Sequence, residues 1–147
     1  MLTTVFSQVR IGETHRIAKT ISESDVYMYA GIVGDFHPNH VNAVYADEKL
    51  GGRVAHGALL TGFVSRCTVE LIGERLTPPG YVAQIFNIKC VSPVFLGDTI
   101  TVIVTISEID IERRKVIMDV KIENQRGQTC AVGETVIKVL REPAAAS

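Results

Sequence analysis

The stretch from Gly34 to His40, with the sequence GDFHPNH, brings together one carboxylate, Asp35, and two imidazoles, His37 and His40. Carboxylates and imidazoles are common donors and acceptors of protons in enzymes. Pro38 fixes its own φ angle and restricts the residue before it to extended geometry, so the segment has little freedom. We therefore expect residues 34–40 to form a rigid catalytic loop.

A second short stretch, RVAHG at residues 53–57, opens the most apolar helix candidate in the chain, and the two stretches together indicate one active site. A lone histidine is usually a structural hydrogen-bonding group, and an aspartate after a glycine often forms a turn. The combination of Asp35, His37 and His40 on one constrained loop favours function instead. We expect His56 to be structural and to brace the turn into the helix.

The elements around these stretches follow from capping and periodicity. A short strand is expected over Glu13–Ile21, and Ser22 with Asp25 forms a capping box that opens a helix over Glu23–Val33. A short helix is expected over Asn42–Leu50. The next helix, Gly57–Ile72, is apolar on most of its circumference, which predicts burial on nearly all sides.

Everything after the break at residues 77–80 reads as strands with short turns. The expected strands are Tyr81–Val91, Thr99–Ile109, residues 116–122 and Thr129–Leu140. This order predicts the α+β class, in which a curved antiparallel sheet wraps a long central helix, the hot-dog fold. The exposed sheet edges predict a homodimer or higher homo-oligomer that joins sheets edge to edge.

Composition limits the possible partners and compartments. The 147 residues fit a single domain over 1–147, with a frayed tail from about residue 142. The formal net charge of -1 lacks the basic excess of nucleic-acid binding proteins. Three cysteines without a C-x-x-C pair predict neither disulfides nor a zinc site and favour the cytoplasm. Because no apolar run approaches the roughly 20 residues of a membrane span, no membrane association is expected.

The pattern GDxxPxH over residues 34–40, followed by AHG at 55–57, resembles the MaoC-like dehydratases and (R)-specific enoyl-CoA hydratases, whose hydratase motif is D-x-N-P-x-H. The stretch SPVFLGD at 92–98 is similar to the R-P-V-x-x-G-D connection of that family. The resemblance extends from the capped helix to the last strand. It implies a reversible hydration of trans-2-enoyl-CoA to (R)-3-hydroxyacyl-CoA in fatty-acid or polyhydroxyalkanoate metabolism.

The resemblance also assigns roles to residues. Asp35 and His40 correspond to the catalytic pair that holds and activates water, and Gly57 corresponds to a backbone N–H that binds the thioester carbonyl. Ser65 corresponds to a supporting active-site serine. The helix N-terminus suits the role of Gly57, because its unpaired N–H groups lie where enolate charge develops.

His37 departs from the family pattern, because it stands where the motif has asparagine. An imidazole can donate one hydrogen bond as an amide does, but it also titrates near neutrality, so substrate range and pH optimum are the properties this change affects. We read Arg53, Arg66 and Lys89 as solvated surface charges and not as phosphate ligands.

Two other functions stay open on the same fold. One is a non-catalytic acyl-thioester binding module, in which His37 marks the loss of hydration chemistry. The other is an acyl-CoA thioesterase, although the pairing of Asp35 with His40 favours the hydratase. The acyl group would be carried by coenzyme A or by acyl carrier protein. No metal or redox cofactor is expected, because no ligand cluster or phosphate-binding glycine loop is present in the sequence.

Overall fold

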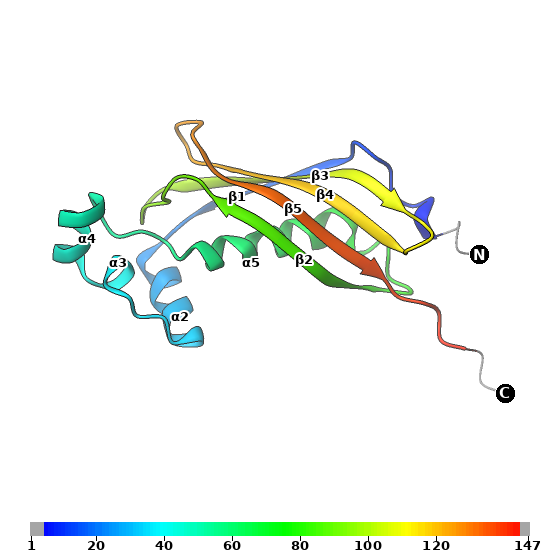
Figure 1. Ribbon diagram of the computed structural model, residues 1–147, viewed down its shortest axis with the longest axis horizontal. Helices are drawn as coiled ribbons and strands as arrows, with labels where there is room; N and C mark the ends of the chain where they lie inside the picture. The colour runs from blue at the N-terminus through cyan, green and yellow to red at the C-terminus, as the bar shows by residue number, and fades with distance from the viewer. Residues whose placement is uncertain (1–4, 145–147) are drawn as a thin grey trace.

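The computed structural model describes residues 5–144. A five-stranded antiparallel sheet lies across one central helix, α5 (Gly57–Thr68) (Figure 1). In the sheet order β1-β3-β4-β5-β2, the strands are β1 (Thr14–Thr20), β3 (Thr99–Asp110), β4 (Lys115–Glu123), β5 (Thr129–Val139) and β2 (Tyr81–Cys90). This arrangement confirms the α+β hot-dog fold predicted from the sequence.

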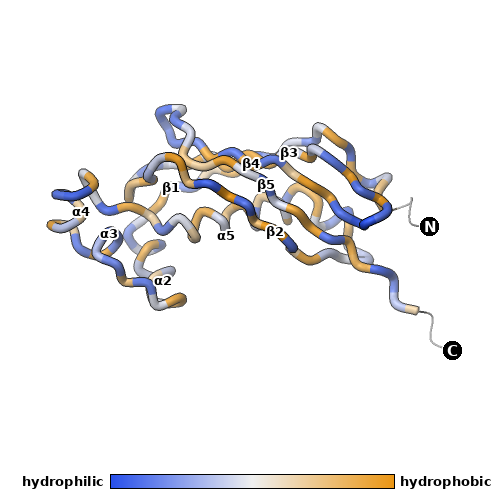
Figure 2. The backbone as a smooth tube through the Cα atoms, viewed as in Figure 1, coloured by the Kyte–Doolittle hydropathy of each residue, from blue (hydrophilic) through white to orange (hydrophobic). Residues whose placement is uncertain are grey.

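The inner face of the sheet is built by the period-two alternation of β3 and β4. Val102 lies opposite Ile122, and Val104 lies opposite Val120, so buried side chains of both strands share one face. Figure 2 shows these hydrophobic segments running along the strands above α5. Burial of this layer against α5 holds the helix under the sheet.

The three smaller helices lie beyond one end of the sheet (Figure 1). They are α2 (Glu23–Val33), α3 (Pro38–Val41) and α4 (Ala43–Leu50). The expected capping box of α2 is present, and its bounds match the prediction. The expectation of a loop through residue 40 was wrong at its end, because the last residues of that stretch begin α3. A proline at the first helical position is preorganised for this turn.

The central helix differs from its prediction in two ways. The α-helix ends at Thr68 and continues as a π-helix over Val69–Gly73, where one uninterrupted helix to Ile72 was expected. Burial on nearly all sides was also wrong, because Ala58 and Gly62 are exposed on the side away from the sheet. Although its sequence is mostly apolar, α5 packs one face on the sheet and leaves another face exposed to solvent in the single chain.

Strand β2 is an edge of the sheet, and most of its residues are exposed. Its large apolar side chains Val82, Ile85 and Phe86 are each more than two-fifths exposed. An edge strand with free backbone groups and apolar side chains can pair with another chain. Helix α5 contacts this edge strand as well as β1 and β3.

Two further expectations concern membrane-spanning helices and the C-terminal tail. No helix within residues 5–144 has the length and apolarity that crossing a membrane requires. Residues 141–144 are exposed and form no helix or strand. The rest of the expected frayed tail, residues 145–147, lies outside the described residues.

Candidate active site

Asp35 directly follows the end of α2. Gly34 closes that helix in the left-handed conformation, with φ 79°, and donates its N–H to the carbonyl of Ala30 at 2.8 Å. The carboxylate of Asp35 is exposed, and its Oδ1 accepts the backbone N–H of His37 at 3.2 Å. This short-range bond fixes the direction in which the chain leaves α2, so Asp35 is held at the start of α3.

His37 acts as the N-cap of α3. Its Nδ1 accepts the backbone N–H of Asn39 at 3.1 Å. Asparagine is among the preferred N-cap residues because its side-chain oxygen accepts the same type of bond. The histidine that replaces the motif's asparagine therefore performs a capping function with a ring nitrogen as the acceptor.

His40 lies within α3 and is buried, with 9% of its surface exposed. Its Nδ1 donates to the carbonyl oxygen of Val54 at 2.7 Å. Because a carbonyl can only accept, Nδ1 carries the proton, and Nε2 keeps a lone pair. This tautomer lets Nε2 of His40 accept a proton from a bound molecule.

His56 joins this site, although it was expected to be structural and to brace the turn into the helix. Its ring stacks on the ring of His40, with centroids 3.7 Å apart and planes inclined by 23°. Its Nε2 donates to the backbone carbonyl of Asp35 at 3.0 Å. Its position next to Gly57 in the sequence indicated that it lies near the site. Its contacts with His40 and Asp35 join residues far apart in the chain, so a sequence pattern does not reveal them.

Gly57 is the first residue of α5, and its backbone N–H lies where a helix has no internal acceptor for it. A side chain at this position would crowd Cys90, since an added Cβ would lie 3.1 Å from the Cys90 Sγ. The segment leading to Gly57 is anchored to the connection between β2 and β3, because the Ala55 N–H donates to the carbonyl of Val94 at 2.8 Å. Phe95, in the SPVFLGD connection, forms an isolated β-bridge with Val54.

The side-chain ligand atoms of Asp35, His40 and His56 all lie within 4.8 Å of one another. Such a group could hold a cation, yet each imidazole already donates to a backbone carbonyl. A carboxylate beside an imidazole with a free lone pair can equally hold a water molecule and move its protons. Burial raises the pKa of the Cys67 thiol to about 11, so Cys67 is not favoured as a thiolate nucleophile.

Ser65 lies apart from this group. It is eight residues beyond Gly57, which is about 12 Å along a helix at 1.5 Å per residue. It lines a cavity of ≈ 20 Å³ between α5 and the sheet, together with Thr68, Tyr81 and Phe86 among others. The structure therefore places the predicted supporting serine beside β2, and room there for about one water molecule limits what it binds.

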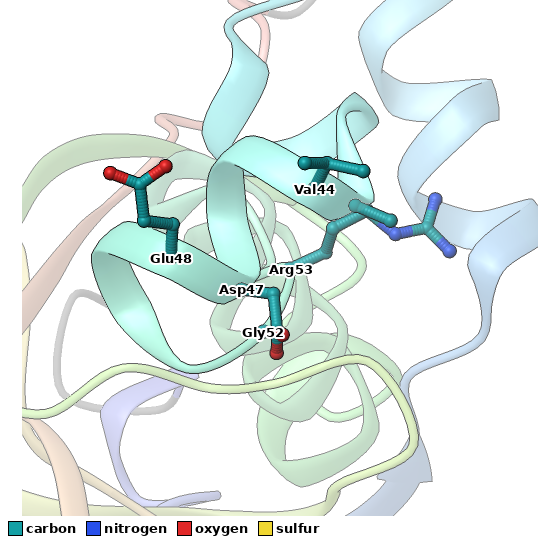
Figure 3. Close-up of a pocket in the computed structure, with 6 residues that line it drawn as sticks. Val44, Asp47, Glu48, Gly52 and Arg53 are labelled. Carbon is teal, nitrogen blue, oxygen red and sulfur yellow. The ribbon is translucent and has the colours of Figure 1, made fainter.

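A larger hollow lies on α4 and has a volume of about 500 Å³. Asp47 and Glu48 line it, and Figure 3 shows Arg53 reaching away from both carboxylates toward α2. Arg53 forms a 2.7 Å ion pair with Glu23 and donates to the hydroxyl of Tyr27. Because its charge is already paired and 19% of its side chain is exposed, Arg53 is an ion-pair residue and not the solvated surface charge that was expected.

Comparison with known proteins gives related sequences over most of the chain. The MaoC like domain matches residues 7–127. An (R)-specific enoyl-CoA hydratase of Rhodospirillum rubrum is 39% identical over 110 residues, which are 74% of this chain and 74% of that protein. A 3-hydroxybutyryl-CoA dehydratase of Methylorubrum extorquens is 34% identical over 135 residues, 90% of this chain and 77% of that protein.

Solved structures share the fold. The (R)-hydratase from Aeromonas caviae superposes with a TM-score of 0.79 at 23% identity, over 90% of this chain and 98% of that one. A fluoroacetyl-CoA thioesterase superposes with a TM-score of 0.64 at 14% identity, over 90% and 88%. At these identities the likeness shows the fold alone, so the fold by itself does not separate hydration from thioester hydrolysis.

Proposed function

Because the chain belongs to the MaoC-like domain family, we propose that it catalyses the reversible hydration of a trans-2-enoyl-CoA to an (R)-3-hydroxyacyl-CoA. The observation that carries this proposal is the meeting of Asp35 and His40 within 4.8 Å, with the helix N-terminus at Gly57 joined directly to their neighbour His56. Relatives named as hydratase and dehydratase support the same reaction class.

In this mechanism one water molecule lies between Asp35 and His40. The free lone pair on His40 Nε2 accepts a proton as the water oxygen bonds to C3 of the enoyl group. The electron pair of the double bond moves toward the thioester carbonyl, and a proton is then delivered from the pair to C2. One proton is taken and one is returned, so the two residues end in their starting state.

The thioester carbonyl is expected to bind at the N-terminus of α5. As the water adds, negative charge builds on the carbonyl oxygen, and the N–H of Gly57 is placed to donate to it. The partial positive charge of the helix N-terminus acts in the same direction. Interactions that strengthen as this charge develops lower the barrier and do not merely bind the substrate.

The proposal includes a homodimer that pairs β2 with β2 of a second copy. An edge strand whose apolar side chains are exposed, next to an uncovered face of α5, supports this assembly. The three free thiols of Cys67, Cys90 and Cys130 suit a reducing compartment, so the proposed location is the cytoplasm.

The test is incubation with crotonyl-CoA, following the conjugated absorbance and the release of free thiol in the same sample. Loss of absorbance without thiol is the result expected for a hydratase. Thiol release would instead support the thioesterase. Binding without either signal would support the non-catalytic module, and both outcomes would overturn the proposed reaction.

A further inference from the structure

His56 has an unusual set of contacts for a residue that only braces a turn. Its side chain is almost completely buried, at 2% exposed. It occupies the N-cap position of α5 but makes no capping hydrogen bond with its side chain. The ring turns instead toward α3, where it stacks on His40, and Tyr29 of α2 packs against it edge-on at 4.8 Å.

The hydrogen bond of His56 fixes its tautomer. The carbonyl of Asp35 can only accept, so the proton lies on Nε2, and Nδ1 keeps its lone pair. Among the side chains of residues 5–144, this Nδ1 is the one buried polar atom without a hydrogen-bond partner. A buried polar group that lacks a partner calls for an explanation, and catalytic sites are one place where such groups occur.

Through these contacts His56 adjoins each of the three groups in the proposed reaction, Asp35, His40 and Gly57. Its ring face stacks on the His40 ring, its Nε2–H donates to the backbone carbonyl of Asp35, and a peptide bond joins it directly to Gly57. We propose that His56 is the positioning residue that sets the distance between the proton-transfer pair and the carbonyl-binding N–H. This inference rests on the proposed hydration and deepens it.

Other bonds hold the two segments together without His56. Val54 N–H donates to the carbonyl of Asn39 at 3.0 Å, and the Val54 carbonyl accepts from His40. A substitution at His56 therefore leaves the segments joined and loosens only the relative placement of the reacting groups. Misplacement by about 1 Å can cost about a hundredfold in rate.

The experiment separates the two contacts with two variants. His56→Phe keeps a ring that can stack and removes the N–H, whereas His56→Gln keeps an N–H donor and removes the ring. With crotonyl-CoA, we expect each to lower kcat by about tenfold and His56→Ala by about a hundredfold, with KM nearly unchanged, since misplacement acts on the reacting groups. His15→Gln, on the half-exposed His15 of β1, is the matched control and should keep wild-type kcat.

A second measurement excludes a merely structural role. If His56 acts by positioning the proton-transfer pair, adding His56→Ala to a variant that already carries Asp35→Asn and His40→Ala should cause little further loss, because the groups it positions are already gone. Multiplied losses in the combined variant would overturn the proposal, as would full activity of His56→Ala. Thermal unfolding of each variant shows whether the chain still folds.

Nuclear magnetic resonance of the imidazole rings tests the contact without any activity. The His40 ring signals should move in His56→Gln, which removes the stacked ring, and should stay in place in His15→Gln. Unmoved His40 signals in His56→Gln would overturn the inference. A wild-type protein that shows this contact but hydrates no enoyl-CoA would overturn only the proposed function.

Discussion

At the scale of single residues, the proposed proton transfer depends on which nitrogen of His40 carries the proton. The 2.7 Å bond to the Val54 carbonyl settles this, since only Nδ1–H can donate to it. Nε2 is then an acceptor beside the Asp35 carboxylate. Acid–base groups held in this way contribute about a hundredfold or more to a rate.

The N–H of Gly57 cannot be removed by changing a side chain, but proline removes it directly. Proline is tolerated at the first helical position, and His56 before it has the extended geometry, with ψ 132°, that a residue before proline needs. We expect Gly57→Pro to lower kcat by about a hundredfold to a thousandfold, as loss of one oxyanion donor does.

The matched control for Gly57→Pro separates the lost N–H from added bulk. Gly57→Ala keeps the N–H but brings a Cβ within 3.1 Å of the Cys90 Sγ. The double change of Gly57→Ala with Cys90→Ala relieves that crowding, so steady-state kinetics should show most of the activity restored. Near-wild-type kcat in Gly57→Pro would exclude the carbonyl-binding role.

At the scale of elements, α3 is a single turn whose position depends on its cap. His37→Asn should keep the cap, since the amide oxygen can accept the Asn39 N–H, and should keep kcat near wild type. His37→Ala removes the acceptor and should destabilise the turn by about 1 kcal/mol. Thermal unfolding together with the hydration rate measures both effects. Loss of activity in His37→Asn would mean that the imidazole itself takes part in the reaction.

The segment after α5 is tied to the start of β1 by an ion pair. Arg75 donates to the Glu13 carboxylate at 2.5 Å, and this bond lowers the pKa of Glu13 below its ordinary value of 4.5. A lowered carboxyl pKa contributes stability that is present above pH 4.5 and is lost as the pH falls through the folded-state value.

Glu13→Gln should therefore be less stable than wild type at neutral pH, by less than about 1 kcal/mol because the pair is partly exposed. Acidification should close the difference. Urea unfolding at several pH values measures it, with the exposed Glu112→Gln as the control. A difference that does not shrink at acid pH would refute the contribution of this pair.

The sequence predicted the elements with strong periodicity and missed those without it. The alternation along β3 and the capping box at Ser22 are local signals, and both elements appear as expected. Helix α3 has one turn, too short for any periodic signal. The apolar circumference of α5 predicted burial, but a sequence does not tell whether the same chain or a second copy provides the cover.

The residues of the candidate site were likewise predicted only in part. The proximity of Asp35 and His40 could be predicted because both lie on one short segment with a fixed proline. The place of His56 could not, because its contacts join residues 16 and 21 positions apart through the packing of α3 against the segment before α5. Ser65 was predicted from resemblance alone, and its cavity lies beside β2.

At the scale of the whole molecule, the open edge at β2 predicts the assembly. Ile85→Arg places a charge on this edge, where 43% of the isoleucine surface is exposed in the single chain. We expect light scattering to give a dimer mass for wild type and a shift toward monomer for Ile85→Arg, since an unpaired charge in an apolar interface is costly. Val44→Arg, on the outer side of α4, should stay dimeric. A monomeric wild type at micromolar concentration would rule out the assembly.

The most direct measurement of the central claim is the rate and stereochemistry of crotonyl-CoA hydration by wild type, Asp35→Asn and His40→Ala. Wild type should give (R)-3-hydroxybutyryl-CoA, and each variant should fall by at least about a hundredfold while remaining folded, as loss of a positioned acid or base predicts. An (S) product, or near-wild-type rates in both variants, would contradict the account.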